Sequence, residues 1–128
     1  MSLKNSLSIM VVDDMSTSRG LITMALEEIG IKNVDFRTDG QSALKALAAK
    51  PVHLVISDYN MPGLDGLQLL KALRENKSTA RIGFILVSGR LDEGIVTNGR
   101  KLGMNNFIAK PFNTAQMRKC IEAVVGPL

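Results

Sequence analysis

Acidic residues follow two apolar runs of this chain. The run LSIMVV is followed by Asp13 and Asp14, and the run VHLVIS is followed by Asp58. A carboxylate at the end of a buried strand is costly unless a partner offsets its charge. Each acid is therefore either a capping residue in a turn or a member of a site.

Two further polar residues hold equivalent positions. Ser88 follows the run IGFILV, and Lys110 follows FIA. If these runs are neighbouring parallel strands, three carboxylates, a hydroxyl and an ammonium group meet at one edge of a sheet. Unpaired carboxylates at short range repel strongly, so the cluster requires a cation. Oxygen ligands without a full protein cage favour Mg²⁺, and Lys110 can place a movable positive charge beside Asp58.

The rest of the pattern supplies the elements that would position these residues. Short apolar runs alternate with amphipathic segments five times. We expect strands at Leu7–Asp13, Val34–Arg37, Val52–Ser57, Ile82–Val87 and Phe107–Ala109, and helices at Ser16–Ile29, Gln41–Ala49, Leu64–Glu75, Asp92–Leu102 and Thr114–Val125. This alternation predicts an α/β fold, with a doubly wound parallel sheet and a site beyond the carboxyl ends of its strands.

The longest expected helix would turn one face toward the sheet. Its apolar residues, among them Leu21, Ile22 and Leu26, recur at helical spacing. Gly30 follows the last of them and is typical of a helix end. We therefore expect these apolar residues to be buried.

Composition narrows the class of protein. A chain of 128 residues suits one domain, expected over residues 1–128, and no apolar run approaches the roughly 20 residues that cross a bilayer. The N-terminus does not resemble a secretory signal, so we expect a cytoplasmic protein without a membrane partner. The net charge is +4, but the basic residues are scattered and aromatic residues make up only 4%. That pattern argues against nucleic-acid binding.

Two other chemistries could use this edge of a sheet. The segment MSTSRG could form a flavodoxin-like phosphate loop, but carboxylates at its mouth would repel a bound phosphate. A phosphatase of the haloacid dehalogenase type would use Asp58 as nucleophile and a second acid two residues later as general acid–base. That later position is Asn60, and the chain has no room for a cap domain.

Four motifs occur together in the order VVDDMSTSR, ISDYNMPGLDG, LVSG and KPFN. From about Leu7 to Val125 the chain resembles the receiver domain of bacterial two-component response regulators. Among receivers it is most similar to the stand-alone chemotaxis type represented by CheY. The resemblance implies a single-domain, flavodoxin-like (βα)5 fold with strand order 2-1-3-4-5 and no output domain.

The resemblance also implies a phosphoacceptor and its metal. Asp58 would take a phosphoryl group from the phosphohistidine of a sensor histidine kinase. Asp14 and Asp58 would bind Mg²⁺ directly together with the backbone carbonyl of Asn60, and Asp13 would act through a metal-bound water. The protein would catalyse only its own phosphorylation and dephosphorylation, as a signalling module rather than an enzyme.

Other residues would handle the phosphoryl group, again by resemblance. Lys110, joined to Pro111 by a cis peptide, would pair with Asp58 and then with a phosphoryl oxygen. Ser88 would donate its hydroxyl to another oxygen and draw its loop inward as a switch. Gly89 and Asn60 would leave access to the site.

Two residues depart from the usual receiver pattern. Phe107 occupies a switch position where receivers usually carry tyrosine, so it offers a partner no hydroxyl. Arg90 stands where CheY of enteric bacteria carries an acid. Because this position lies at the mouth of the site, we expect an altered dephosphorylation rate.

Three functions remain open from the sequence. The first is a chemotaxis regulator, phosphorylated by a CheA-like kinase, that binds the flagellar motor switch protein and is reset by a phosphatase. The second is a phosphate sink or phosphorelay receiver without motor binding. The third is a small metal-dependent phosphohydrolase. We expect a monomer in each case.

Overall fold

The computed structural model describes residues 3–128. Its strands are β1 (Ser8–Val12), β2 (Asn33–Arg37), β3 (Leu54–Asp58), β4 (Gly83–Ser88) and β5 (Asn106–Ala109), and its helices are α1 (Leu3–Ser6), α2 (Ser16–Ile29), α3 (Gly40–Ala49), α4 (Gly66–Glu75), α5 (Glu93–Lys101) and α6 (Thr114–Val125). The strands form one parallel sheet in the order β2-β1-β3-β4-β5, which confirms the predicted fold. No helix within the described range is long and apolar enough to cross a membrane.

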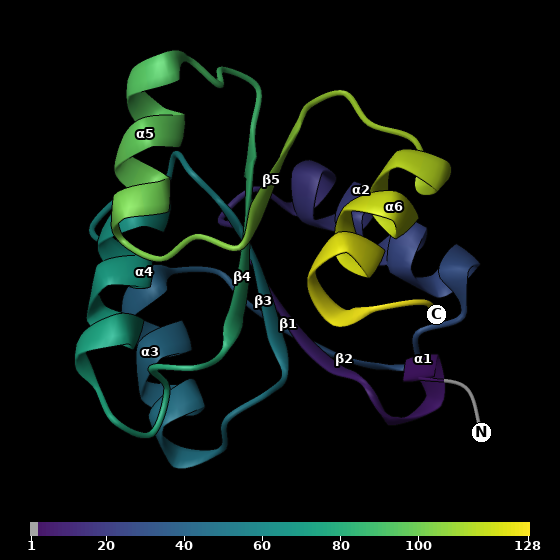
Figure 1. Ribbon diagram of the computed structural model, residues 1–128, viewed down its shortest axis with the longest axis horizontal. Helices are drawn as coiled ribbons and strands as arrows, with labels where there is room; N and C mark the ends of the chain where they lie inside the picture. The colour runs from purple at the N-terminus through teal and green to yellow at the C-terminus, as the bar shows by residue number, and fades with distance from the viewer. Residues whose placement is uncertain (1–2) are drawn as a thin grey trace.

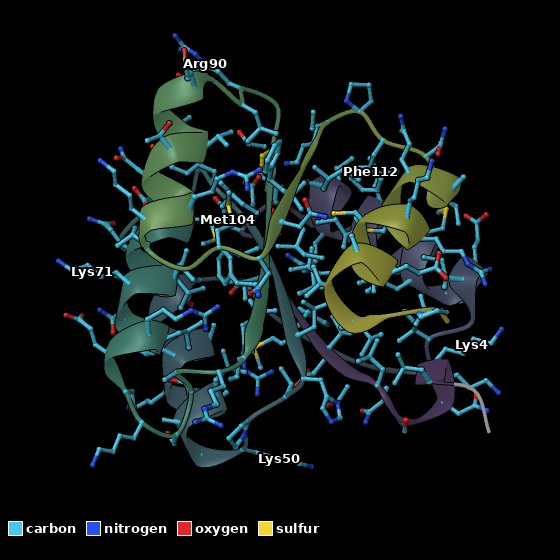
Figure 2. The ribbon with its side chains drawn as sticks, in the orientation of Figure 1. Lys4, Lys50, Lys71, Arg90, Met104 and Phe112 are labelled. Carbon is cyan, nitrogen blue, oxygen red and sulfur yellow. The ribbon has the colours of Figure 1, made fainter. Side chains whose placement is uncertain are left out.

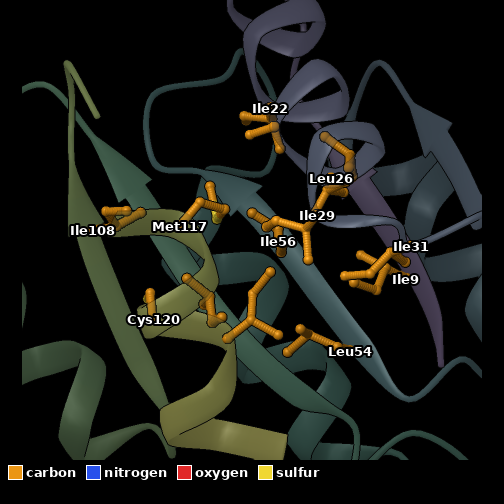
Figure 3. Packing of buried hydrophobic residues seen from close by; sticks show 14 of the residues in the cluster. Ile9, Ile22, Leu26, Ile29, Ile31, Leu54, Ile56, Ile108, Met117 and Cys120 are labelled. Carbon is orange, nitrogen blue, oxygen red and sulfur yellow. The ribbon is translucent and has the colours of Figure 1, made fainter. Parts of the chain in front are cut away.

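Helices cover both faces of the sheet. Figure 1 shows α2 and α6 on one side and α3, α4 and α5 on the other. Charged side chains such as Lys50 and Lys71 point away from the sheet (Figure 2). The central strand β3 is buried along its whole length because both of its faces are covered. In the core beneath α2 and α6, Leu26 and Met117 pack near Ile56 of β3 (Figure 3).

Several details differ from the sequence-based expectations. Helix α1 was not expected, and α4 begins at Gly66 rather than Leu64. The later start follows from a capping box, in which Asp65 accepts from the Gln68 backbone N–H at 2.8 Å and Gln68 accepts from the Asp65 N–H at 2.9 Å. The expectation for Leu21 was also wrong. Its side chain is 57% exposed because it lies beside the buried stripe of α2.

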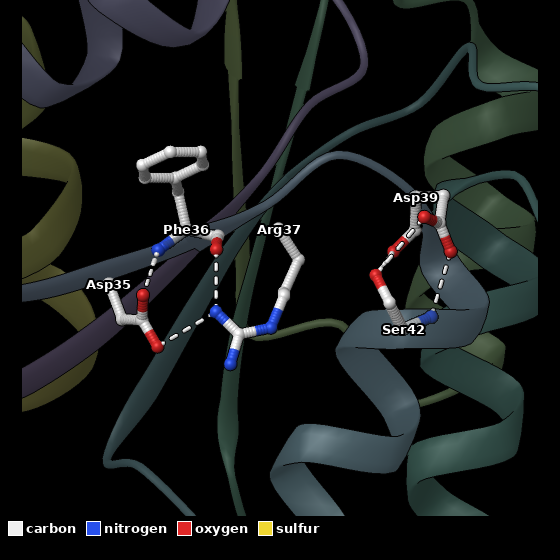
Figure 4. Close-up of polar contacts among 5 residues, drawn as sticks. All are labelled: Asp35, Phe36, Arg37, Asp39 and Ser42. Carbon is white, nitrogen blue, oxygen red and sulfur yellow. Dashed lines mark hydrogen bonds and ion pairs between the residues drawn. The ribbon is translucent and has the colours of Figure 1, made fainter.

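The outer edge of β2 is partly closed by its own side chains. The Phe36 backbone N–H donates to Asp35 Oδ1 at 2.8 Å, and Arg37 Nη1 donates to the Phe36 carbonyl at 2.8 Å (Figure 4). Arg37 Nη1 also lies 2.9 Å from Asp35 Oδ2. These bonds satisfy backbone groups that would otherwise face solvent at a sheet edge.

Candidate functional site

Asp58 lies at the carboxyl end of β3 and is 5% exposed. Its Oδ1 is 2.9 Å from Lys110 Nζ, which comes from the segment directly after β5. Burial raises the pKa of the Asp58 carboxyl above its usual value, the hydrogen bond from Lys110 lowers it, and the charge of Asp13 raises it again. The charged form of Asp58 is therefore disfavoured on balance, even with a lysine in contact.

Asp13 and Asp14 bring two more carboxylates to this position. Each of the three acids has an oxygen within 4.8 Å of the others. Asp13 is fully buried, and its Oδ1 accepts a hydrogen bond from the Met15 N–H at 3.0 Å. Its Oδ2 is buried without a hydrogen-bond partner among residues 3–128. A buried oxygen of this kind calls for a ligand, and the all-oxygen donor set fits a hard divalent cation.

Ser88 ends β4 on the other side of Asp58. Its side chain is buried, and its Oγ accepts a hydrogen bond from the Arg90 N–H at 3.0 Å. The Lys110 N–H donates to the Ser88 carbonyl at 2.9 Å, which ties the two strand ends together. The Lys110–Pro111 peptide is cis, as the resemblance implied. The structure therefore brings together the residues predicted at four strand ends.

A hollow opens above Asp58. It is lined by Met15, Asp58, Tyr59, Asn60, Ser88, Gly89, Arg90, Ile95 and Lys110. Arg90 is exposed on its rim and lies in the loop before α5, beside the amino end of that helix (Figure 2). Phe107 lies outside this hollow, half-buried on β5, with the Arg100 guanidinium 5.6 Å from the centre of its ring.

Gly66 allows the loop after β3 to return across the end of that strand. The Gly66 N–H donates to the Tyr59 carbonyl at 2.8 Å. A β-carbon at this position would lie 2.5 Å from the Asp58 carbonyl oxygen. The close approach therefore requires glycine, and it fixes the backbone that carries the Asp58 carboxylate.

Sequence reasoning missed two contributors to the site. The Met15 N–H holds Asp13 Oδ1, and Arg19 Nη1 donates to the Asp13 carbonyl at 3.0 Å. Both residues lie inside the motif VVDDMSTSR, which was the available signal. The motif does not show which atoms they contact.

Comparisons with known proteins agree with this geometry. The model of the response regulator receiver domain matches residues 9–122. The probable chemotaxis protein CheY of Rhizobium etli is 41% identical over 128 residues, which cover all of this chain and 99% of that protein. The chemotaxis protein CheY-3 of Vibrio cholerae is 28% identical over 95% of this chain and 94% of its own length.

Solved structures show the same fold. CheY4 of Vibrio cholerae matches with a TM-score of 0.85 at 24% identity, covering 92% of this chain and 98% of its own. The receiver domain of the sensor histidine kinase PA1611 from Pseudomonas aeruginosa, whose structure has a magnesium ion in the active site cleft, matches with a TM-score of 0.84 at 24% identity. It covers 94% of this chain and 98% of its own.

The family assignment rests on the extent of these matches together with the site. The receiver model spans residues 9–122, and a relative above 40% identity is matched from end to end. The five residues predicted at strand ends occupy one edge of the sheet. The chain belongs to the response regulator receiver family and is a CheY-like response regulator of two-component systems.

Proposed function

We propose that the protein accepts a phosphoryl group on Asp58 from the phosphohistidine of a sensor histidine kinase. The observation that carries this proposal is the buried Asp58 carboxylate at the base of an open hollow, in contact with Lys110 and beside two further acids. A nucleophile in that position is held rigidly and can be reached from one side. The reaction depends mainly on positioning and electrostatics.

The transfer uses few groups of the chain. A carboxylate oxygen of Asp58 attacks the phosphorus, the P–N bond breaks, and the imidazole leaves and takes up a proton from solvent. Lys110 moves from Asp58 to a phosphoryl oxygen. Because the Ser88 hydroxyl oxygen accepts from the Arg90 N–H, its own proton is free to donate to a second phosphoryl oxygen.

The acidic cluster has a role in the same step. Asp14 and Asp58 would hold Mg²⁺ directly with the Asn60 carbonyl, and Asp13 would hold it through water. The ion neutralises charge on the transferring group when it is bound. The buried and unpartnered Asp13 Oδ2 supports this assignment within the described residues.

We place the protein in chemotaxis as a cytoplasmic receiver. A CheA-like kinase would be the donor, and the phosphorylated form would bind the flagellar motor switch protein. The chemotaxis names of relatives of the same length support this role. Ser88 and Phe107 would carry the switch, and a phosphatase would reset it.

A phosphate sink or relay receiver is the second candidate. Phe107 favours it, because a phenylalanine at the switch position cannot offer a hydroxyl to a motor protein. Binding to purified motor switch protein with and without phosphorylation separates the two roles. Binding that increases on phosphorylation supports motor control, whereas no binding in either state supports the sink.

Labelling with radioactive acetyl phosphate tests the chemistry itself. The wild-type protein should take up label in Mg²⁺ and lose that capacity in EDTA. Asp58→Asn should take up none, whereas Asp65→Asn, which alters a capping acid in the following loop, should label normally. Label on Asp58→Asn, or turnover of varied phosphomonoesters, would contradict the proposal and favour a phosphohydrolase.

A further inference from the structure

Arg19 lies beside the acidic cluster, but its guanidinium contacts an aromatic ring and a backbone carbonyl instead of a carboxylate. Its guanidinium carbon lies 4.7 Å from the centre of the Phe36 ring, and its Nη1 donates to the Asp13 backbone carbonyl at 3.0 Å. Within residues 3–128 the ion pairs do not include Arg19. The positive charge is therefore close to the carboxylates without occupying any of them.

Phe36 provides the surface that holds this guanidinium. It lies on the edge strand β2 and is 48% exposed, so it contributes little to the core. A cation above an aromatic face is attracted by the ring. An arginine side chain without that face would be free to take many rotamers.

Asp13 is fixed by contacts on three of its atoms. Its N–H donates to the Arg37 carbonyl at 3.1 Å, its carbonyl accepts from Arg19, and its Oδ1 accepts from the Met15 N–H. The backbone and one carboxylate oxygen are thereby held, which leaves one direction for Oδ2. That atom is the buried oxygen without a partner among the described residues.

We propose that Arg19, stacked on Phe36, is a positioning residue that orients Asp13 Oδ2 toward the water through which Asp13 would hold the divalent cation. The proposal rests on the acidic cluster being the cation site of the proposed function. It assigns Phe36, on the outer strand of the sheet, a part in a site to which it contributes no ligand. The arrangement also brings a positive charge near the acids without competing with the cation for their oxygens.

Calorimetric titration with Mg²⁺ alone, without a phosphodonor, tests the proposal. Phe36→Leu removes the aromatic face and keeps an apolar side chain, and Arg19→Lys keeps the charge and loses the planar fork. Each should weaken Mg²⁺ binding by about 3–10-fold, at or below the range found when groups behind metal ligands are changed. Phe36→Tyr should restore wild-type affinity.

Three controls separate positioning from general destabilisation. Met24→Ala, at an exposed position of the same helix, should bind Mg²⁺ like the wild type. The double variant Arg19→Lys/Phe36→Leu should have about the same Mg²⁺ affinity as the single variant that binds Mg²⁺ less tightly, because both substitutions act through the one contact between these side chains. In metal-free protein, the amide resonance of Met15 should shift in the single variants and return in Phe36→Tyr.

The outcomes distinguish this inference from the proposed function. Wild-type affinity in either Arg19→Lys or Phe36→Leu overturns the positioning role, and so does equal weakening in Met24→Ala. If instead the wild-type protein binds no Mg²⁺ and takes up no label, the proposed cation site itself fails. Circular dichroism spectra of the two single variants check that both fold.

Discussion

Replacing Asp58 by asparagine should stabilise the protein at pH 7 in EDTA. The substitution removes a buried charge and keeps an oxygen that can accept from Lys110. At an effective dielectric constant of about 20, the attraction across the 2.9 Å contact with Lys110 is worth about 6 kcal/mol, and repulsion from Asp13, which lies within 4.8 Å, at least about 3.5 kcal/mol. Asparagine loses most of the attraction.

The other contributions favour asparagine. The neutral side chain is not repelled by Asp13, and it avoids a carboxylate desolvation cost of several kcal/mol. Its hydrogen bond with Lys110 retains about 1.5–3 kcal/mol of the lost attraction. We expect a net stabilisation of about 1–3 kcal/mol. For a chain of this length that corresponds to a rise in Tm of roughly 4–12 °C.

The pH dependence follows from the direction of the Asp58 pKa. Burial raises this pKa above its unfolded value. The free-energy cost of the buried Asp58 charge is therefore absent below the unfolded pKa of about 4, where the carboxyl is protonated, and it grows as the pH rises through the folded pKa. The advantage of Asp58→Asn should therefore be larger at pH 7 than at pH 4 and should shrink as the pH falls toward the unfolded pKa. Added Mg²⁺ should reduce the stability difference between Asp58→Asn and the wild type at pH 7, because Mg²⁺ at tenfold excess over its Kd stabilises the wild type by about 1.4 kcal/mol.

Urea unfolding followed by circular dichroism measures these differences. Asp92→Asn is a matched control, because it neutralises an acid that caps α5 and asparagine caps equally well. Its stability should match that of the wild type. An Asp58→Asn protein no more stable than wild type in EDTA at pH 7, or an advantage undiminished at pH 4, would refute the electrostatic reasoning.

Four further changes test other parts of the structure. Gly66→Ala should cost about 1–3 kcal/mol in urea unfolding, because its β-carbon would collide with backbone at 2.5 Å, and an unchanged midpoint would contradict that contact. Arg74→Ala should cost about 2–3 kcal/mol more than Arg74→Lys, since the guanidinium donates to three backbone carbonyls, those of Ala80 and Ile82 in one segment and that of Gly103 in another. Burial raises the pKa of the Cys120 thiol to about 11, so iodoacetamide at pH 8 should modify it about 100-fold more slowly in native than in urea-unfolded protein. Arg90→Glu should change the rate at which the phosphorylated protein loses its label, and equal rates would show that this rim residue does not influence attack by water.

The sequence was sufficient to predict the main parts of the site. Asp13, Asp14, Asp58, Ser88 and Lys110 each follow or end an apolar run, and parallel strands bring their carboxyl ends to one edge. Their convergence follows from the alternation of strands and helices together with the strand order, which the resemblance to receiver domains supplied. The end of α2 was also predictable, from helical spacing and from Gly30, which follows the helix.

Contacts between elements were not predictable in the same way. Helical spacing placed Leu21 with the buried residues, but how far the sheet extends beneath α2 decides which flank is covered. The contacts from Arg19 to Phe36 and from Gly66 to the Asp58 backbone depend on the distance between segments far apart in sequence or on loop geometry. A periodic pattern within one element carries no information about these distances.

The closed edge of β2 has a consequence for how copies of this protein meet in a crowded solution. A strand arriving from another molecule must bond to the outward N–H and carbonyl of Phe36, both already occupied by Asp35 and Arg37. Assembly by sheet extension would begin by breaking an intramolecular ion pair and two hydrogen bonds. The backbone of Phe36 thus discourages fibre-like growth, while its ring lies against the Arg19 guanidinium.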